Sequence, residues 1–311
     1  MTADILAVLT SPEFLSSLLR LATPLLIATM GSIFVEKSGI LFLGLEGFML
    51  IGAFFGFVGG VLFNPWVGLL FAVLAALILG LIFAFFTVSL AVDQVVVSLA
   101  VNLFSLGVTS SFLRLIFGLS TSRVESEVFK PIAIPLLSRI PWLGAVFNMN
   151  GFTYLGLLMV PVVYIIFFKT DWGLRIRAVG ENPKAAETMG VKVRNIKYTS
   201  ILWASAFAGL GGASLTLGDL GLFTDNMVAG KGFIGFAAIV LGRFHPVWVM
   251  VTVLFFGMVE AFELNLQAMG SSIPYQFPLM LPYLLTLIAF LIAGSGLAPK
   301  AWGKPFIAGD E

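Results

Sequence analysis

Few residues of this 311-residue sequence could perform covalent chemistry. It contains no cysteine and a single histidine, His245, so a thiolate metal site, a cysteine nucleophile and a histidine-based triad lack their usual groups. The patterns Gly-x-Ser-x-Gly and His-Glu-x-x-His are absent as well. Glu260 and Glu263 could form a carboxylate pair, because residues three apart share one face of a helix. Such a pair alone does not indicate an enzyme, and we predict no catalytic or metal site.

Four polar residues interrupt long apolar runs: Glu46, Asn102, Glu260 and Glu263. Carboxylates inside a bilayer are costly and usually face protein or a water-filled path. Glu46 could line such a path beside the backbone amide of Gly47. It could equally cap a broken helix, or pair with Lys231 or Arg243. Asn102 could line the path or bond a neighbouring helix, so both interpretations stay open for Glu46 and for Asn102.

The composition predicts that these residues lie in a membrane protein. Apolar residues make up 59% of the chain and charged residues 11%, whereas a soluble domain carries about 25% charged residues. A net charge of +1 argues against nucleic acid as a partner. We read no removable signal peptide at the N-terminus, because no basic residue precedes the first apolar run.

The apolar runs predict an all-α integral membrane protein with about nine spans in one domain, 1–311. A spanning helix needs about 20 apolar residues. The predicted spans are 14–34, 40–62, 66–91, 95–117, 152–168, 198–219, 232–244, 246–264 and 275–294. The span 232–244 is short and rich in glycine, which indicates a broken helix buried in protein or lining a cavity.

The distribution of positive charge predicts the orientation. Seven basic residues lie between the fifth and sixth spans: Lys169, Arg175, Arg177, Lys184, Lys192, Arg194 and Lys197. Short loops rich in lysine and arginine stay in the cytoplasm, so 169–197 is expected inside and 118–150 outside. Nine spans then place the N-terminus outside and the C-terminus in the cytoplasm.

Two stretches resemble each other weakly. One begins at Glu46 with "EGFMLIGAFFG", and the other begins at Lys231 with "KGFIGFAAIVLG". Each is followed by a polar residue and a proline, Pro65 or Pro246, which open the next helix. With the predicted orientation the two arms run in opposite directions, which is an inverted repeat of the kind common in transporters. A chance match between two apolar segments is the alternative.

The stretch "VGENPKAAETMG", 179–190, predicts a short, water-facing helix over 183–189. Asn182 is a favourable N-cap, because its side chain can accept an unpaired N–H of the first turn. Pro183 suits the first helical position, and Gly190 suits the left-handed residue that ends a helix. Helices this short are marginal in water, so this one is expected to lean on its own chain or on a partner.

The residues around this helix resemble a known family. The run "AAETMG" is similar to the Glu-Ala-Ala-x-x-x-Gly motif of permeases from ABC importers, with Lys184 in place of the glutamate. The wider stretch 173–215 resembles permeases of the branched-chain amino acid and simple-sugar group. Further similarity comes from "VEKSGILFLGLEGFMLIGAFFG", "NMVAGKGFIGFAAIVLGRFHP" and "IPYQFPLMLPYLLTLI". Together these stretches look like the nucleoside and simple-sugar subgroup, and the resemblance extends from about residue 20 to 295.

The resemblance implies that 183–189 is the coupling helix, which docks on an ATPase subunit in the cytoplasm. Its candidate residues are Gly180, Glu181, Asn182, Pro183, Lys184, Ala185, Ala186, Glu187, Met189 and Gly190. The adjacent Ala185 and Ala186 would permit close approach to the partner. No Gly-x-x-x-x-Gly-Lys-Ser/Thr loop is present, so this chain is expected to bind no cofactor and the ATPase to be a separate chain.

The implied function is the translocation of a nucleoside or a simple sugar across the bacterial cytoplasmic membrane. The candidate pathway residues are Glu46, Gly47, Phe48, Asn102, Phe104, Phe233 and Glu260, the aromatic ones because a base can stack on them. The implied partners are the ATPase, a second permease of a different chain and an external substrate-binding lipoprotein. A riboflavin-like substrate and a homodimer are not excluded by the sequence.

A second hypothesis is an ion-coupled secondary transporter of a small polar solute. Glu46, Asp93 and Glu260 would then bind protons or sodium ions. The capped helix at 183–189 and its motif argue against this hypothesis.

Overall fold

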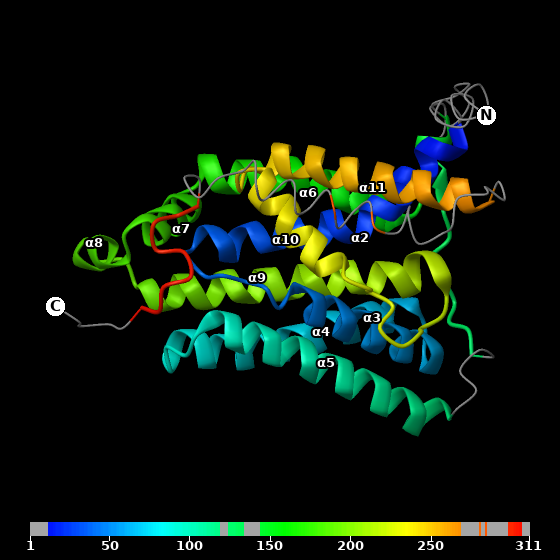
Figure 1. Cartoon of the computed structure of the whole chain (residues 1–311), viewed down its shortest axis with the longest axis horizontal. Helices are drawn as coiled ribbons and strands as arrows, with labels where there is room; N and C mark the ends of the chain where they lie inside the picture. Colours follow the sequence, from blue (N-terminus) through cyan, green and yellow to red (C-terminus); the bar gives the residue numbers. More distant parts are fainter. Residues whose placement is uncertain are drawn as a thin grey trace.

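The computed structural model describes residues 12–118, 124–133, 144–268, 280, 284 and 298–306. Within these ranges the chain is almost entirely helical (Figure 1). The long helices are α2 (Pro12–Lys37), α3 (Leu45–Leu62), α4 (Pro65–Ala84), α5 (Gln94–Phe117), α6 (Gly151–Lys169), α9 (Val193–Ala213) and α11 (Pro246–Ala268). The π-helical turns η1 (Phe85–Ser89) and η5 (Ser214–Leu220) extend α4 and α9. Seven helices of the described ranges are long and apolar enough to cross a membrane.

The remaining elements are short. They are the helices α7 (Asp171–Glu181), α8 (Pro183–Thr188) and α10 (Lys231–Leu241), the 3-10 turn η4 (Gly144–Phe147) and the strands β1 (Ile132–Ala133) and β2 (Asn148–Met149). The strands pair antiparallel, with Ile132 opposite Met149. They lie within the predicted outer loop 118–150. The predicted ninth span, 275–294, lies outside the described residues except for 280 and 284.

Helix α9 forms the centre of the molecule and packs against α2, α3 and α4. Glycines permit these close approaches. A Cβ on Gly212 would overlap the carbonyl oxygen of Met49, and a Cβ on Gly52 would overlap the backbone of Gly209. Small residues that bring backbones together are the usual basis of helix packing in membranes, where the lipid competes for apolar contacts. The central helices thereby form a rigid core around which the others are placed.

The second predicted span, 40–62, begins too early. Helix α3 starts at Leu45, and the segment 38–44 before it is not helical. Hydrophobicity alone cannot distinguish a buried extended segment from a helix. Side chains accept hydrogen bonds from amides that have no helical partner here: the N–H of Leu41 donates to Gln94 Oε1 at 2.7 Å, and the N–H of Phe42 donates to Glu36 Oε1 at 2.9 Å. Non-helical backbone is stable in the interior of the protein because these side chains accept the hydrogen bonds of its N–H groups.

Helices α3 and α10 begin in the middle of the molecule and extend toward opposite ends (Figure 1). Glu46 and Lys231, the first residues of the predicted repeats, lie in their first turns. The helices that follow begin at Pro65 and Pro246, as the pattern predicted. The opposite directions of α3 and α10 are those that an inverted repeat requires, and the repeat itself stays a prediction.

Candidate functional site

Helix α8 has the caps that the sequence predicted and ends one residue earlier than predicted, at Thr188. The side chain of Asn182 accepts a hydrogen bond from the N–H of Ala185 at 3.1 Å, and Pro183 is the first helical residue. Gly190 has φ of +82°, a left-handed conformation that glycine adopts without strain. The N–H of Gly190 donates to the carbonyl of Glu187 at 2.9 Å. Local sequence therefore determines both ends of this helix.

The two faces of α8 differ from the sequence-based expectation. Ala186 is buried, with 5% of its surface exposed, and belongs to the hydrophobic core of its own chain. Ala185 and Met189 are exposed, and Met189 is 84% exposed. The two alanines therefore do not form one docking surface, because only Ala185 is available to a partner. Lys184, Glu187 and the preceding Glu181 are exposed as well.

Helix α8 protrudes at one end of the molecule, beyond the ends of the long helices (Figure 1). It packs on α7 and α9. Gly180, in the last turn of α7, is buried, and a Cβ there would overlap the carbonyl oxygen of Lys37 at the end of α2. Gly180 therefore serves close packing that positions α8, and it does not present a surface to a partner.

Glu46 holds the beginning of α10. Its Oε1 accepts a hydrogen bond from the N–H of Gly230 at 2.8 Å, and its Oε2 accepts one from the N–H of Gly232 at 2.7 Å. Gly230 is the N-cap of α10 and has φ of +86°. The first N–H groups of a helix have no partner within the helix and carry partial positive charge, so a carboxylate stabilises them. Of the interpretations of Glu46, the cap of a broken helix is the one with direct contacts.

Asn102 does the same for the beginning of α3. Its Oδ1 accepts a hydrogen bond from the N–H of Gly47 at 2.8 Å, and its Nδ2 donates to the carbonyl of Leu43 at 3.1 Å. A Cβ on Gly47 would come within 2.9 Å of the carbonyl oxygen of Val101, so α5 approaches α3 closely here. The beginnings of α3 and α10 are thus held together by side chains of α3 and α5. We call this region, Leu43–Gly47 with Gly230–Gly232, the helix junction.

Lys231 and Glu260 form an ion pair beside the helix junction. The pair links α10 to α11, so the ammonium group of Lys231 compensates the carboxylate of Glu260. Asp93, the third acid of the ion-coupled hypothesis, caps α5 by accepting hydrogen bonds from the N–H groups of Val95 at 2.9 Å and Val96 at 3.0 Å. Each of the three acids therefore has local partners.

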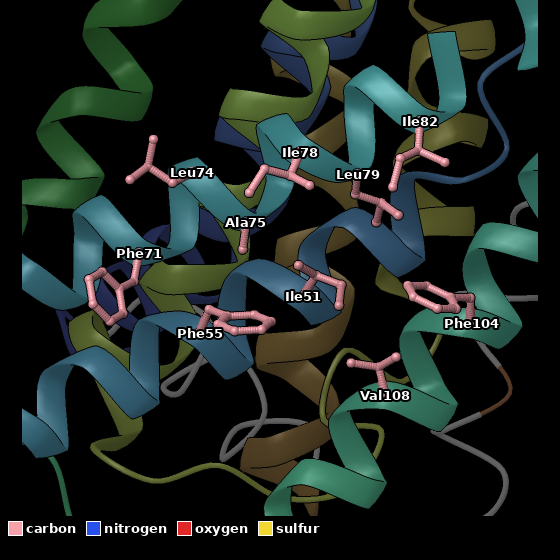
Figure 2. Close-up of a pocket in the computed structure, with 10 residues that line it drawn as sticks. All are labelled: Ile51, Phe55, Phe71, Leu74, Ala75, Ile78, Leu79, Ile82, Phe104 and Val108. Atoms are coloured by element: carbon pink, nitrogen blue, oxygen red, sulfur yellow. The ribbon is translucent and has the colours of Figure 1, made fainter. Parts of the chain in front are cut away.

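The three candidate aromatic residues have different environments. Phe48 is fully buried, with its ring centroid 4.9 Å from that of Phe42. Phe104 is 56% exposed and Phe233 is 44% exposed. Phe104 lines an open groove of about 360 Å³ between α3, α4 and α5 (Figure 2). The groove is lined by Ile51, Phe55, Phe71, Leu74, Ala75, Ile78, Leu79, Ile82, Phe104 and Val108, which are all apolar.

The predicted pathway residues are therefore not gathered in one cavity of the described chain. Glu46, Gly47 and Asn102 meet at the helix junction, whereas Phe48 belongs to the core and Phe104 to the apolar groove. The groove offers no hydrogen-bonding side chain to a polar solute. Phe233 remains as an exposed ring in the first turn of α10, next to the junction.

Sequence reasoning missed Glu36, the most buried acid of the described chain. None of its surface is exposed. Its Oε1 accepts a hydrogen bond from the N–H of Phe42, and its Oε2 accepts one from the indole Nε1–H of Trp302. The position of Glu36 at the end of an apolar run was consistent with a solvated helix end, and only the distant Trp302 reveals its role.

His245 lies between α10 and α11, outside the spanning segments. Burial lowers its pKa, and the nearby charge of Lys37 lowers the pKa further. The ring of Phe168 packs against the imidazole at 5.3 Å. The neutral imidazole is therefore the form that the folded protein favours.

Comparison with known proteins shows the family to which this chain belongs. The model of the family described as branched-chain amino acid transport system / permease component matches residues 14–293. The chain belongs to this permease family. The permease is a transport subunit, and in ABC transporters of this kind a separate subunit hydrolyses ATP.

Three named relatives match the permease over most of its length. It is 36% identical to the guanosine ABC transporter permease protein NupQ of Bacillus subtilis (strain 168), over 93% of this chain and 95% of the relative. It is 33% identical to the nucleoside ABC transporter permease protein NupC of Lactococcus lactis subsp. cremoris (strain MG1363), over 94% and 96%. A second guanosine ABC transporter permease protein of the Bacillus strain, NupP, is 25% identical over 94% and 84%.

Proposed function

We propose that the permease carries nucleosides into the cell as the membrane-spanning subunit of an ATP-driven importer. The names of NupQ and NupC support a nucleoside as the substrate. The substrate would be delivered by an external binding lipoprotein, and the membrane would be the bacterial cytoplasmic membrane. The helices of the described chain are long enough for the span, and their exposed apolar side chains suit a lipid surface.

The observation that carries the proposal is the geometry of α8. A helix of six residues is too short to be stable alone, yet this one is capped at both ends and held by the buried Ala186. Helix α8 lies at one tip of the molecule (Figure 1), and its Ala185 and the adjoining Met189 are exposed. A largely exposed methionine suits an irregular groove on a partner, because its side chain is flexible and polarizable. We assign α8 as the coupling helix that docks on the ATPase.

We further propose that the solute path passes the helix junction. Phe233 offers an exposed ring there for stacking on a base, while Glu46 and Asn102 position the beginnings of α10 and α3. Phe104 would face a second permease subunit, because its groove is apolar and open. NupQ and NupP, two different permease proteins named for guanosine in one organism, support a second subunit that is a different chain.

The orientation can be tested with single cysteines, because the chain contains none. Lys184 and Glu127 are both exposed and lie in the two segments that we place on opposite sides. A membrane-impermeant maleimide added to intact cells should label Glu127→Cys and spare Lys184→Cys. Labelling of Lys184→Cys from outside would overturn the proposed orientation.

The transport activity can be tested by reconstitution. The permease is placed in proteoliposomes with its ATPase, the second permease and the binding lipoprotein, and uptake of radiolabelled guanosine and glucose is compared. We expect guanosine uptake that requires ATP and is not reduced by excess glucose. Uptake of glucose alone would refute the nucleoside assignment. Uptake driven by a sodium or proton gradient without ATP would favour the ion-coupled hypothesis.

The path is tested by Phe233→Ala in the same system. We expect the variant to assemble and hydrolyse ATP normally while the KM for guanosine uptake rises, because one stacking surface is lost. Leu62→Ala is a matched control, since Leu62 is also an exposed apolar residue but lies at the end of α3. An unchanged KM in Phe233→Ala would remove this ring from the path.

A further inference from the structure

The segment Ala298–Phe306 joins parts of the permease that are far apart in the sequence. We call it the clasp. In Figure 1 it is the red segment beside α7 and the end of α2. Pro299, Ala301 and Phe306 are buried although the segment is not helical. A non-helical segment this well buried must have its backbone groups satisfied by the elements around it.

The backbone of the clasp bonds three different elements. The N–H of Ala301 donates to the carbonyl of Gly180 in α7 at 2.9 Å, and the N–H of Gly303 donates to the carbonyl of Gly39 at 3.2 Å. The carbonyl of Lys304 accepts a hydrogen bond from Nε2 of Gln94, the first residue of α5, at 3.3 Å. The clasp therefore fixes the end of α7 relative to the segment 38–44 and to α5.

Trp302 connects the clasp to α10 and, through Glu36, to the segment 38–44. Its indole N–H donates to Glu36 Oε2, and the other carboxylate oxygen of Glu36 accepts the N–H of Phe42 on the way to α3. Its ring stacks on that of Phe236 in α10, with centroids 5.9 Å apart and planes 10° apart. A second ring, Phe244, meets it edge-on at 5.6 Å. One side chain thus contacts α10 and, through Glu36, the segment that leads into α3.

These contacts place the clasp between α7, which leads into α8, and the elements at the helix junction, α10 and the segment before α3. Helix α8 packs on α7 and α9, whereas α10 packs on α2, α3 and α11. Gly180, which bonds the clasp, lies two residues before Asn182, the N-cap of α8. Its backbone also meets the carbonyl of Lys37 so closely that no Cβ fits between them. A displacement of α8 by an ATPase would therefore displace Gly180 and the clasp with it, since closely packed interiors transmit strain.

We propose that the clasp transmits the movement of α8 to the helix junction, and that Trp302 and Glu36 are the positioning residues of this connection. The proposal rests on the assignment of α8 as the coupling helix. Helix α9, which follows α8 in the chain and packs against α3, is a direct connection between α8 and the helix junction. The clasp is a second connection. Without the hydrogen bond from Trp302 to Glu36, the ATPase would still dock on α8 and hydrolyse ATP. The movement of α8 would then displace α10 and α3 less than in the wild type.

The test is the number of guanosine molecules imported per ATP hydrolysed, in proteoliposomes that contain the complete transporter. Trp302→Phe keeps the ring contacts with Phe236 and Phe244 and removes the N–H that Glu36 accepts. Glu36→Gln replaces one of the two acceptor oxygens by an amide NH2 group and keeps an oxygen for the N–H of Phe42. We expect the ratio of import to hydrolysis to fall about fivefold or more in each variant, with ATPase binding within about twofold of wild type.

Trp203→Phe is the matched control. Trp203 is 44% exposed and stacks on Phe207, and within the described residues its indole N–H makes no hydrogen bond. The control should leave the ratio unchanged. An unchanged ratio in Trp302→Phe and Glu36→Gln would overturn the proposal. Import, hydrolysis and assembly falling in parallel would also overturn it, because that result means a role in stability alone.

A failure of the clasp proposal can be distinguished from a failure of the α8 assignment. The α8 assignment is judged by the affinity of the ATPase for Met189→Ser, which leaves the clasp intact. The clasp proposal is judged by the ratio of import to hydrolysis in Trp302→Phe, which leaves the surface of α8 intact. Normal ATPase affinity in Met189→Ser would refute the docking surface whatever the clasp variants do.

Discussion

Met189→Ser is the sharpest test of the docking surface on α8. The side chain of Met189 is 84% exposed and has the highest exposed fraction among the large apolar residues of the described chain. It is the C-cap of α8, and its N–H donates to the carbonyl of Ala185, which is also exposed. If the ATPase receives this helix in a groove, docking removes the methionine from water.

The magnitude follows from the exposed area. Full burial of a methionine side chain contributes roughly 1.5–3 kcal/mol, so burial of the exposed 84% contributes about 1.3–2.5 kcal/mol. This corresponds to roughly a ten- to sixtyfold change in affinity, because about 1.4 kcal/mol is tenfold. The folded permease should be nearly unaffected, since an exposed substitution changes its stability by no more than about 0.5 kcal/mol.

The assay is a titration of the ATPase subunit against the permease in nanodiscs. Leu62→Ser serves as the control, because Leu62 is 57% exposed and lies at the end of α3 that points away from α8. We expect Met189→Ser to weaken binding by the stated factor and Leu62→Ser to leave it unchanged. A change of less than about twofold in Met189→Ser would contradict the reasoning.

Three further variants test the structural roles described above. Glu46→Gln should lower the free energy of unfolding in SDS by about 1–3 kcal/mol, because the amide leaves one of the two helix N–H groups of Gly230 and Gly232 without an acceptor. An unchanged free energy of unfolding would mean that Glu46 does not stabilise the beginning of α10. Gly180→Ala should destabilise the permease by about 1–3 kcal/mol through overpacking against the Lys37 carbonyl. Gly107→Ala, whose Cβ meets nothing within 4 Å, should cause no such loss, and equal effects in the same SDS assay would refute the packing argument. His245 has a pKa below its ordinary value of about 6.5, so its stabilising contribution is present above pH 6.5 and is lost as the pH falls through the folded pKa. The loss of thermal stability between pH 7.5 and pH 5 should therefore be smaller in His245→Asn than in wild type. An equal loss would contradict the lowered pKa of His245 in the folded protein.

Elements encoded by local sequence were predictable. The ends of α8 follow from Asn182, Pro183 and Gly190, each of which acts within its own turn. The starts of α4 and α11 follow from Pro65 and Pro246 in the same way. These signals need no information about distant parts of the chain, because a cap or an N1 proline satisfies backbone groups only a few residues away.

Features that depend on tertiary contacts were not predictable. The direction of Ala186 depends on which side of α8 meets α7 and α9, and a six-residue helix with two adjacent alanines carries no periodic pattern to decide this. The non-helical segment 38–44 depends on Gln94 and Glu36, and hydropathy favours a helix there. The contact of Glu36 with Trp302 joins residues 266 positions apart, so no local pattern could indicate it.

The most direct test of the account is a crosslink between α8 and the ATPase. Ala185 is exposed, and the chain has no cysteine, so Ala185→Cys introduces one thiol at the proposed contact. A short bismaleimide should join this position to a cysteine scanned along the ATPase surface in the assembled, transport-active complex. We expect a permease–ATPase product with Ala185→Cys and none with Leu62→Cys at the opposite end. An active complex in which no ATPase position crosslinks to Ala185→Cys would contradict the docking of α8.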